Sequence, residues 1–137
     1  MPIEMNELFG IAGKVAVITG AGGVLGGNIA KHFMRQGAKV VAVDIRQEQL
    51  DKRVSELKQY GNEVIGVVGD VLDVASLGKL AGQVLSQWGK IDLLLNIAGG
   101  NMPGATLEPE QHFYDMDIAC WEKAVSYTHL TLPTICS

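Results

Sequence analysis

Glycines crowd into one short segment of the chain, between an apolar run and the start of a helical pattern. Residues 14–27 read KVAVITGAGGVLGG. A strand end followed by a helix start brings backbone N–H groups and the positive end of a helix dipole to one point, and glycines leave room there for a large anion. The pattern predicts a diphosphate site of a dinucleotide; the alternative is a merely tight turn. The residues expected to wrap the diphosphate are Thr19, Gly20, Gly22, Gly23, Leu25 and Gly26.

An acidic residue follows at a distance that suits the same ligand. Asp44 ends the second apolar run, 18 positions after Gly26. A carboxylate there can accept hydrogen bonds from the hydroxyls of the adenosine ribose and repel a 2′-phosphate, so it favours NAD over NADP. Arg46 lies two residues further on and could instead meet a phosphate. The alternative for Asp44 is a solvated aspartate in a turn.

Two later strand ends carry further candidates for the same site. Asp70 and Val71 follow the third apolar run, where the carboxylate can meet the amino group of adenine and the valine its ring face; capping or turn formation is the alternative. Asn96, Ala98 and Gly99 close the fourth run. Small residues there let the chain pass the nicotinamide ribose, while Asn96 ties neighbouring strand ends together, shapes the pocket, or does both.

The elements that must position these residues alternate along the chain. Four apolar runs separated by helical patterns indicate a parallel sheet with right-handed crossovers. We predict an α/β protein with an incomplete Rossmann fold, strand order 3-2-1-4 and helices on both faces of the sheet. The expected strands cover residues 14–19, 39–44, 63–69 and 91–96, and the expected helices cover about 23–36, 47–60 and 74–88, with another from near 117.

The helical patterns also predict which side chains are buried. In the helix over 74–88, Asp73 is the expected N-cap, and the apolar positions from Val74 to Trp88 are expected to face the sheet. Trp121, in the last predicted helix, is expected in the core as well.

Composition narrows the class of protein. Hydrophobic residues make up 47% of 137 residues, and 11 Lys and Arg against 15 Asp and Glu give a net charge of −4. Nothing in this balance favours nucleic acid or an anionic membrane. No apolar run approaches the ~20 residues of a membrane span. With only Cys120 and Cys136 present and no metal-ligand spacing of Cys and His, we expect neither a disulfide framework nor a metal site, and a cytoplasmic location.

The end of the chain departs from the pattern before it. Residues 125–134 read VSYTHLTLPT, and no Asp, Glu, Lys or Arg occurs from Val125 onward. This string resembles a translation of the transposase-end adapter used to prepare sequencing libraries; the alternative is an ordinary β-rich segment. We therefore expect residues 1–125 to be the N-terminal part of a Rossmann NAD-binding domain and residues 126–137 to be a non-native tail.

Together these motifs resemble the short-chain dehydrogenase/reductase family. The matching features are the T-G-x-x-x-x-x-G turn from Thr19, then Asp44, the pair Asp70 and Val71, and N-x-A-G at residues 96–99. The family usually has glycine in place of Val24 and a second asparagine in place of Ile97. These departures look most like a sugar-acid branch similar to D-mannonate oxidoreductases, also called fructuronate reductases.

The resemblance implies an NAD(P)-dependent oxidoreductase that interconverts a sugar acid, such as D-mannonate, or a polyol and its keto form, and that forms homo-oligomers. A tyrosine activated by a lysine takes the hydroxyl proton, a serine steadies the oxygen and an asparagine holds a water relay. We place no catalytic residue in this chain: the serine and the Tyr-x-x-x-Lys would lie further on, the asparagine position holds Thr128, and no lysine follows Tyr127. We therefore expect cofactor binding, with NAD preferred, but no turnover.

Other functions fit parts of the pattern. The main alternative is a non-catalytic module that binds NAD. An extended-type epimerase or dehydratase of nucleotide sugars would carry glycines where Ala21 and Val24 stand, and a methyltransferase would not need the segment at residues 96–99.

Overall fold

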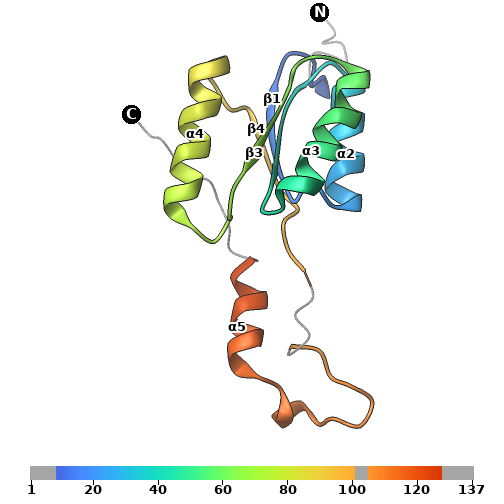
Figure 1. Cartoon of the computed structure of the whole chain (residues 1–137), viewed down its shortest axis with the longest axis vertical. Helices are drawn as coiled ribbons and strands as arrows, with labels where there is room; N and C mark the ends of the chain where they lie inside the picture. The colour runs from blue at the N-terminus through green and yellow to red at the C-terminus, as the bar shows by residue number, and fades with distance from the viewer. Residues whose placement is uncertain (1–8, 101–104, 128–137) are drawn as a thin grey trace, which may run out of the picture.

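A parallel sheet forms the centre of the molecule. The computed structural model describes residues 9–100 and 105–127. Within them, β1 (Val15–Thr19), β2 (Lys39–Asp44), β3 (Val64–Val68) and β4 (Leu93–Asn96) pair in the order β3-β2-β1-β4, with every pairing parallel (Figure 1). The predicted strand order is confirmed. Because parallel strands run the same way, the carboxyl ends that carry the motif residues meet at one edge of the sheet.

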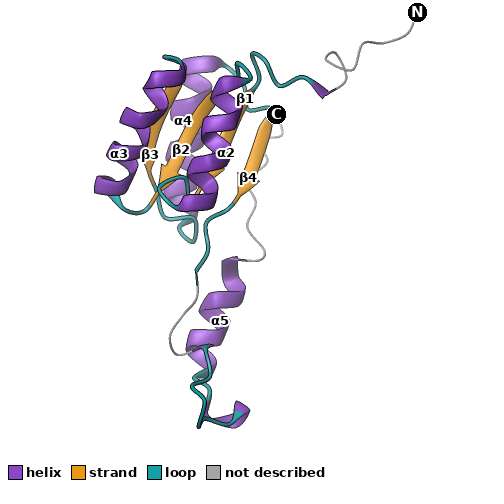
Figure 2. Cartoon of the chain, turned by 90° about the vertical axis from the view of Figure 1, so that its right-hand side faces the viewer, coloured by secondary structure: helices purple, strands orange, loops and turns teal. Residues whose placement is uncertain are grey.

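Helices cover both faces of this sheet, as predicted. The helices α2 (Val24–Arg35) and α3 (Gln47–Leu57) lie on one face, and α4 (Val74–Trp88) lies on the other (Figure 2). A 3-10 turn at Lys58–Tyr60 continues α3, so the helix predicted over 47–60 tightens in its last residues. Among the described residues, no helix combines the length and the apolar character needed to cross a membrane.

Alternating side chains of the strands build a separate core on each face of the sheet. Toward α2 and α3, the fully buried Ile18 packs with Leu50 and Leu57. Toward α4, the buried Val17 packs with Leu80 and Val84. The period of two residues in a strand explains this division, since neighbours such as Val17 and Ile18 point to opposite faces. The two central strands are therefore buried on both sides.

The first residue of α4 departs from its predicted burial. Asp73 caps the helix as predicted, because its carboxylate accepts a hydrogen bond from the N–H of Ala75 at 3.0 Å. Val74 is nevertheless 74% exposed, so the expectation that it faces the sheet is wrong. It lies in the first turn of the helix, ahead of the buried Leu77 and Leu80. Trp88 is partly buried against the core, as expected.

A last helix, α5 (Ile118–Ser126), lies apart from the sheet (Figures 1 and 2). It begins where predicted, because the Asp117 carboxylate accepts a hydrogen bond from the N–H of Ala119 at 2.9 Å. None of its residues is buried. Trp121 is 51% exposed, so the expectation that it lies in the core is wrong. The predicted boundary at Val125 falls inside this helix. Of the predicted tail, Ser126 and Tyr127 are described, while Thr128 and all later residues lie outside the described residues.

Candidate functional site

The glycine-rich turn between β1 and α2 depends on the absence of side chains. Gly20 has a φ of +67°, in the left-handed region that L side chains rarely adopt. A Cβ at Gly20 would lie 2.8 Å from the backbone N of Ala98, and a Cβ at Gly26 would overlap the carbonyl oxygen of Gly20. These glycines therefore let α2 start directly against the end of β1 and let the end of β4 pass close by.

The N-terminus of α2 is suited to an anion. Its N-cap residue, Gly23, makes no side-chain hydrogen bond to the helix, and the first turn contains no acidic residue. The first N–H groups of an α-helix have no partner within the helix and carry the positive end of its dipole. Val24 and Leu25, at the start of this helix, are 80% and 63% exposed. This helix end can therefore receive a phosphate group from the solvent side.

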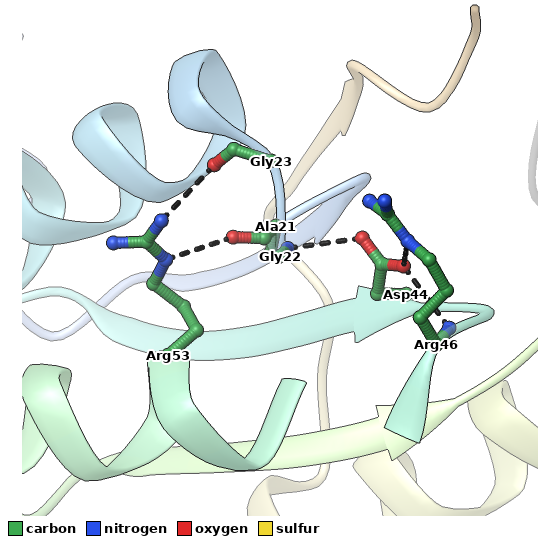
Figure 3. Close-up of polar contacts among 6 residues, drawn as sticks. All are labelled: Ala21, Gly22, Gly23, Asp44, Arg46 and Arg53. Carbon is green, nitrogen blue, oxygen red and sulfur yellow. Dashed lines mark hydrogen bonds and ion pairs between the residues drawn. The ribbon is translucent and has the colours of Figure 1, made fainter. Parts of the chain in front are cut away.

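The Asp44 carboxylate is held in the site by three hydrogen bonds. It is only 5% exposed. Its Oδ2 accepts a hydrogen bond from the N–H of Gly22 at 3.0 Å, and its Oδ1 accepts from the N–H and the Nε of Arg46 at 3.1 and 3.2 Å (Figure 3). A carboxylate has roughly four acceptor positions, so it can take further donors. The carboxylate is thus held in place at the end of β2 while still able to bind hydroxyl groups.

Thr19 joins the ends of β1 and β4. This buried side chain accepts hydrogen bonds at Oγ1 from the N–H groups of Ile97 and Ala98, both at 3.1 Å, and donates to the carbonyl oxygen of Leu95 at 3.4 Å. Thr19 therefore ties these strand ends together, the role that the sequence analysis gave to Asn96. Asn96 pairs in register with Thr19 and is exposed.

The turn after β3 combines a structural role with a place beside the site. The Oδ1 of Asp70 accepts a hydrogen bond from the N–H of Leu72 at 2.9 Å, and the N–H of Asp70 donates to Ser76 Oγ at 3.2 Å. The N–H of Gly69 donates to the carbonyl oxygen of Asp44 at 3.2 Å, which fastens this turn to the end of β2. Asp70 therefore shapes its own turn and also lines the cavity at this edge of the sheet.

These elements surround one cavity of about 370 Å³ at the carboxyl edge of the sheet. Its volume lies within the range of small-molecule sites. Nine of the twelve residues predicted to bind a cofactor line it, namely Gly20, Gly23, Leu25, Gly26, Asp44, Asp70, Val71, Ala98 and Gly99. Thr19, Gly22 and Asn96 do not line it, although Thr19 and Gly22 fix the residues that do.

Sequence reasoning missed several residues of the lining. They are Val24, Val43, Ile45, Gly69, Ile97 and Tyr127, and Arg46 joins them after being weighed for a phosphate. Most are chain neighbours of motif residues, so the position at a strand end was the available signal. Tyr127 follows α5 directly, and no motif in the sequence links it to the cavity.

Comparison with known proteins gives a consistent family. The model of the short chain dehydrogenase family matches residues 14–131. The chain is 40% identical over 125 residues to an uncharacterised oxidoreductase, UxuB, of Bacillus subtilis strain 168, covering 85% of this chain and 44% of that protein.

Two solved structures share the fold. One, a proposed D-mannonate oxidoreductase from Haemophilus influenzae with bound NAD, is similar with a TM-score of 0.80 and 29% identity over 92% of this chain and 49% of that one. The other is a 3-ketoacyl-(acyl-carrier-protein) reductase from Brucella melitensis complexed with NADH. It is similar with a TM-score of 0.73 and 32% identity over 87% of this chain and 45% of that one. The chain spans less than half the length of these proteins, and their substrates differ.

Proposed function

The chain belongs to the short-chain dehydrogenase family, and from this premise we propose that its cavity binds NAD and that the protein is an NAD-dependent oxidoreductase. One observation carries the proposal. The Asp44 carboxylate is almost fully buried, held by the N–H of Gly22, and placed in the lining of the cavity. A buried carboxylate fixed beside a helix N-terminus matches the ribose and diphosphate of a dinucleotide.

The residues present fit this cofactor from end to end. The N-terminus of α2, capped by Gly23, would take the diphosphate, and Asp44 would take the ribose hydroxyls. Asp70 and Val71 would meet adenine, while Ala98 and Gly99 would flank the nicotinamide ribose. When bound, NAD supplies hydride acceptance or donation. The chain's own residues would hold the adenosine and the diphosphate, and the residues at the end of β4 would lie beside the nicotinamide ribose.

The site favours NAD over NADP. A 2′-phosphate would approach the Asp44 carboxylate, and the guanidinium of Arg46 is already engaged with that carboxylate at 3.2 Å. The binding of NAD and NADH by the two similar structures supports the same preference.

The substrate and assembly belong to the same proposal. We propose a sugar acid such as D-mannonate, or a polyol, as substrate, supported by the likeness to the proposed D-mannonate oxidoreductase. We further propose that the protein assembles as a homo-oligomer; Ile118 and Trp121, 71% and 51% exposed on α5, provide apolar surface for that contact. No tyrosine in the sequence has lysine four positions later, so the 137-residue chain is expected to bind cofactor without turnover.

The test of the cofactor proposal is titration of NADH and NADPH by fluorescence. Asp44→Asn keeps the size of the side chain and removes its charge, and we expect NADH affinity to fall about tenfold while NADPH affinity does not fall. Asp51→Asn is the matched control, because Asp51 is exposed on α3 and its carboxylate accepts a hydrogen bond from the side chain of Gln47 on the same helix. Equal NADH affinity in both variants would refute the role of Asp44, and no binding by the unaltered protein would refute the proposed cofactor.

Two further measurements test the catalytic and tail assignments. Incubation of the 137-residue chain with NAD and D-mannonate should produce no NADH absorbance, and steady NADH production would contradict the absence of a catalytic group. Sequencing the source DNA across the codons of Val125 and Ser126 tests the proposed tail. A frame that continues into an asparagine, a serine and a Tyr-x-x-x-Lys supports the enzyme, whereas a genuine tail followed by a stop codon favours a non-catalytic NAD-binding module.

A further inference from the structure

Arg53 reaches from α3 to the glycine-rich turn. Its Nε donates a hydrogen bond to the carbonyl oxygen of Ala21, and its Nη2 donates to that of Gly23, both at 3.2 Å (Figure 3). Its Nη1 pairs with Glu56 on the outer side of α3 at 2.6 Å. The side chain is 23% exposed, so the guanidinium is largely enclosed between the helix and the turn. A planar fork of donors is thereby fixed against two backbone carbonyls.

The two carbonyls that Arg53 holds belong to peptide groups that face the site. In a planar trans peptide the C=O and the N–H point in opposite directions. The carbonyl of Ala21 shares its peptide with the N–H of Gly22, and that N–H donates to Asp44 Oδ2 at 3.0 Å. Figure 3 shows Arg53 on one side of the turn and Asp44 on the other. The same peptide is therefore held from both sides, by a guanidinium and by a carboxylate.

The second carbonyl acts on the start of α2. The carbonyl of Gly23 shares its peptide with the N–H of Val24, a residue that lines the cavity. This N–H is the first of the helix and has no partner within it. The Gly23 carbonyl accepts a hydrogen bond from the N–H of Gly27 at 3.0 Å as well as from Arg53. The helix and the guanidinium together therefore direct the Val24 N–H away from Arg53, toward the side where the diphosphate would lie.

The helix leaves room for the guanidinium at one position. Gly27 is buried inside α2, and a Cβ added there would overlap the guanidinium of Arg53. Glycine is a poor residue for a helix interior, because it loses more backbone freedom than alanine. Its φ is not in the left-handed region, so the backbone conformation does not require it. The requirement at this position is space for Arg53.

We propose that Arg53 is a positioning residue of the cofactor site, which fixes the peptides of residues 21–24 so that their N–H groups meet Asp44 and the diphosphate. The inference rests on the proposed NAD function for its consequence, but the fixing of the turn stands on contacts within the chain. Arg53 does not itself line the cavity, and it acts through the backbone of Ala21 and Gly23 that it holds.

The first experiment compares Arg53→Met with Lys52→Met, which removes the same charge from an exposed pair with Glu48 on the same helix. NADH affinity should fall about tenfold in the first variant and less than about twofold in the control. Amide hydrogen exchange of Gly22 in the cofactor-free protein should accelerate at least about tenfold in Arg53→Met and not in Lys52→Met. The reason is that Arg53 no longer holds the Ala21 carbonyl, so the peptide that donates the Gly22 N–H to Asp44 opens more often.

The second experiment uses Gly27, where the native arginine stays but its space is filled. Gly27→Ala should weaken NADH binding and speed Gly22 exchange like Arg53→Met, and the double variant should be no worse than either single one. Arg53→Lys keeps the charge but cannot fork to two carbonyls, so most of the loss should persist.

The outcomes separate this inference from the proposed function. If the unaltered protein binds no NADH, the cofactor proposal fails, and Gly22 exchange alone decides the role of Arg53. If Arg53→Met and Lys52→Met give the same Gly22 exchange, or if Arg53→Lys restores full affinity, the positioning role is overturned.

Discussion

The two ends of the described chain differ in how far they bury their side chains. Every residue of β1 is buried, and β2 is buried from Val40 to Asp44. In β4 no residue is buried, and α5 has no buried residue at all. The region from β1 to α3 is thus a closed unit built around one core, whereas β4 and α5 leave apolar side chains such as Ile118 and Trp121 in contact with solvent.

This difference shows where the candidate site gets its precision. The diphosphate and ribose positions lie in the closed unit, where Asp44, Arg53 and the glycines fix one another by short contacts. The part of the cavity contributed by residues 97–99 and Tyr127 comes from the open region. A site built across the closed unit and the open region should therefore still bind the diphosphate and the ribose even if β4 and α5 move. The following changes test that division.

The largest effect on the site is expected from Gly20→Ala in the closed unit. The left-handed φ of +67° strains any L side chain, and the new Cβ would press on the backbone of Ala98. The two costs together should lower the free energy of unfolding by about 3 kcal/mol and abolish NADH binding. Urea unfolding followed by circular dichroism, with NADH titration beside it, measures both.

Gly82 is the matched control for Gly20, because its substitution by alanine is expected to change the free energy of unfolding in the opposite direction. Gly82 lies inside α4 with nothing within 4 Å of an added Cβ, so Gly82→Ala should raise the free energy of unfolding by about 0.5–1 kcal/mol. Destabilisation by both substitutions would mean that helix α4 is packed more tightly than its contacts show, and a harmless Gly20→Ala would contradict the closed turn.

The fold was largely predictable because its signals are local. Apolar runs of strand length, glycines at strand ends and Asp73 before a helix each act over a few residues, and they sufficed for the strand order and for helices on both faces. The same local signals identified nine residues that line one cavity. A pattern with period two or 3.6 states which face is apolar, and in a parallel sheet that is enough to place the strand ends together.

The features that the sequence did not predict depend on contacts between residues far apart in the chain. Arg53 lies 30 positions from Gly23, and no spacing rule marks an arginine on an exposed-looking helix as the partner of a turn. Thr19 bonds across 78 positions to Ile97, and no local pattern marks this threonine as a tie between strand ends. Trp121 was expected in the core because of its type, yet burial also needs a surface to pack on, which α5 lacks among the described residues.

A medium effect is expected where β4 joins the closed unit. Asp92 Oδ2 accepts a hydrogen bond from the N–H of Val15 at 2.7 Å and pairs with Lys90 at 2.9 Å. The Val15 N–H first, and then Lys90, hold the pKa of Asp92 below its ordinary value of 3.8. Because the folded pKa is the lower one, the stability that Asp92 contributes is complete above pH 3.8 and is lost as the pH falls through the folded pKa.

Asp92→Asn should therefore lower the free energy of unfolding by about 1 kcal/mol at pH 7, and the difference from the unaltered protein should shrink below about pH 4. Urea unfolding at a series of pH values measures this. A difference that stays constant down to pH 2 would show that Asp92 holds β4 by shape and not by charge. NADH affinity at pH 7 should change little, since the diphosphate and ribose positions lie in the closed unit.

The smallest effect is expected in α5. Trp121→Ala removes a large side chain that is 51% exposed on a helix without buried residues, and the free energy of unfolding should change by less than about 0.5 kcal/mol. Leu80→Ala in α4, where the side chain is 1% exposed, should cost about 2–5 kcal/mol under the same conditions. A cost near that of Leu80→Ala would show that Trp121 is covered in solution. If that cost also grew with protein concentration, the cover would be a second copy of the chain, and the open region would be where the proposed oligomer forms.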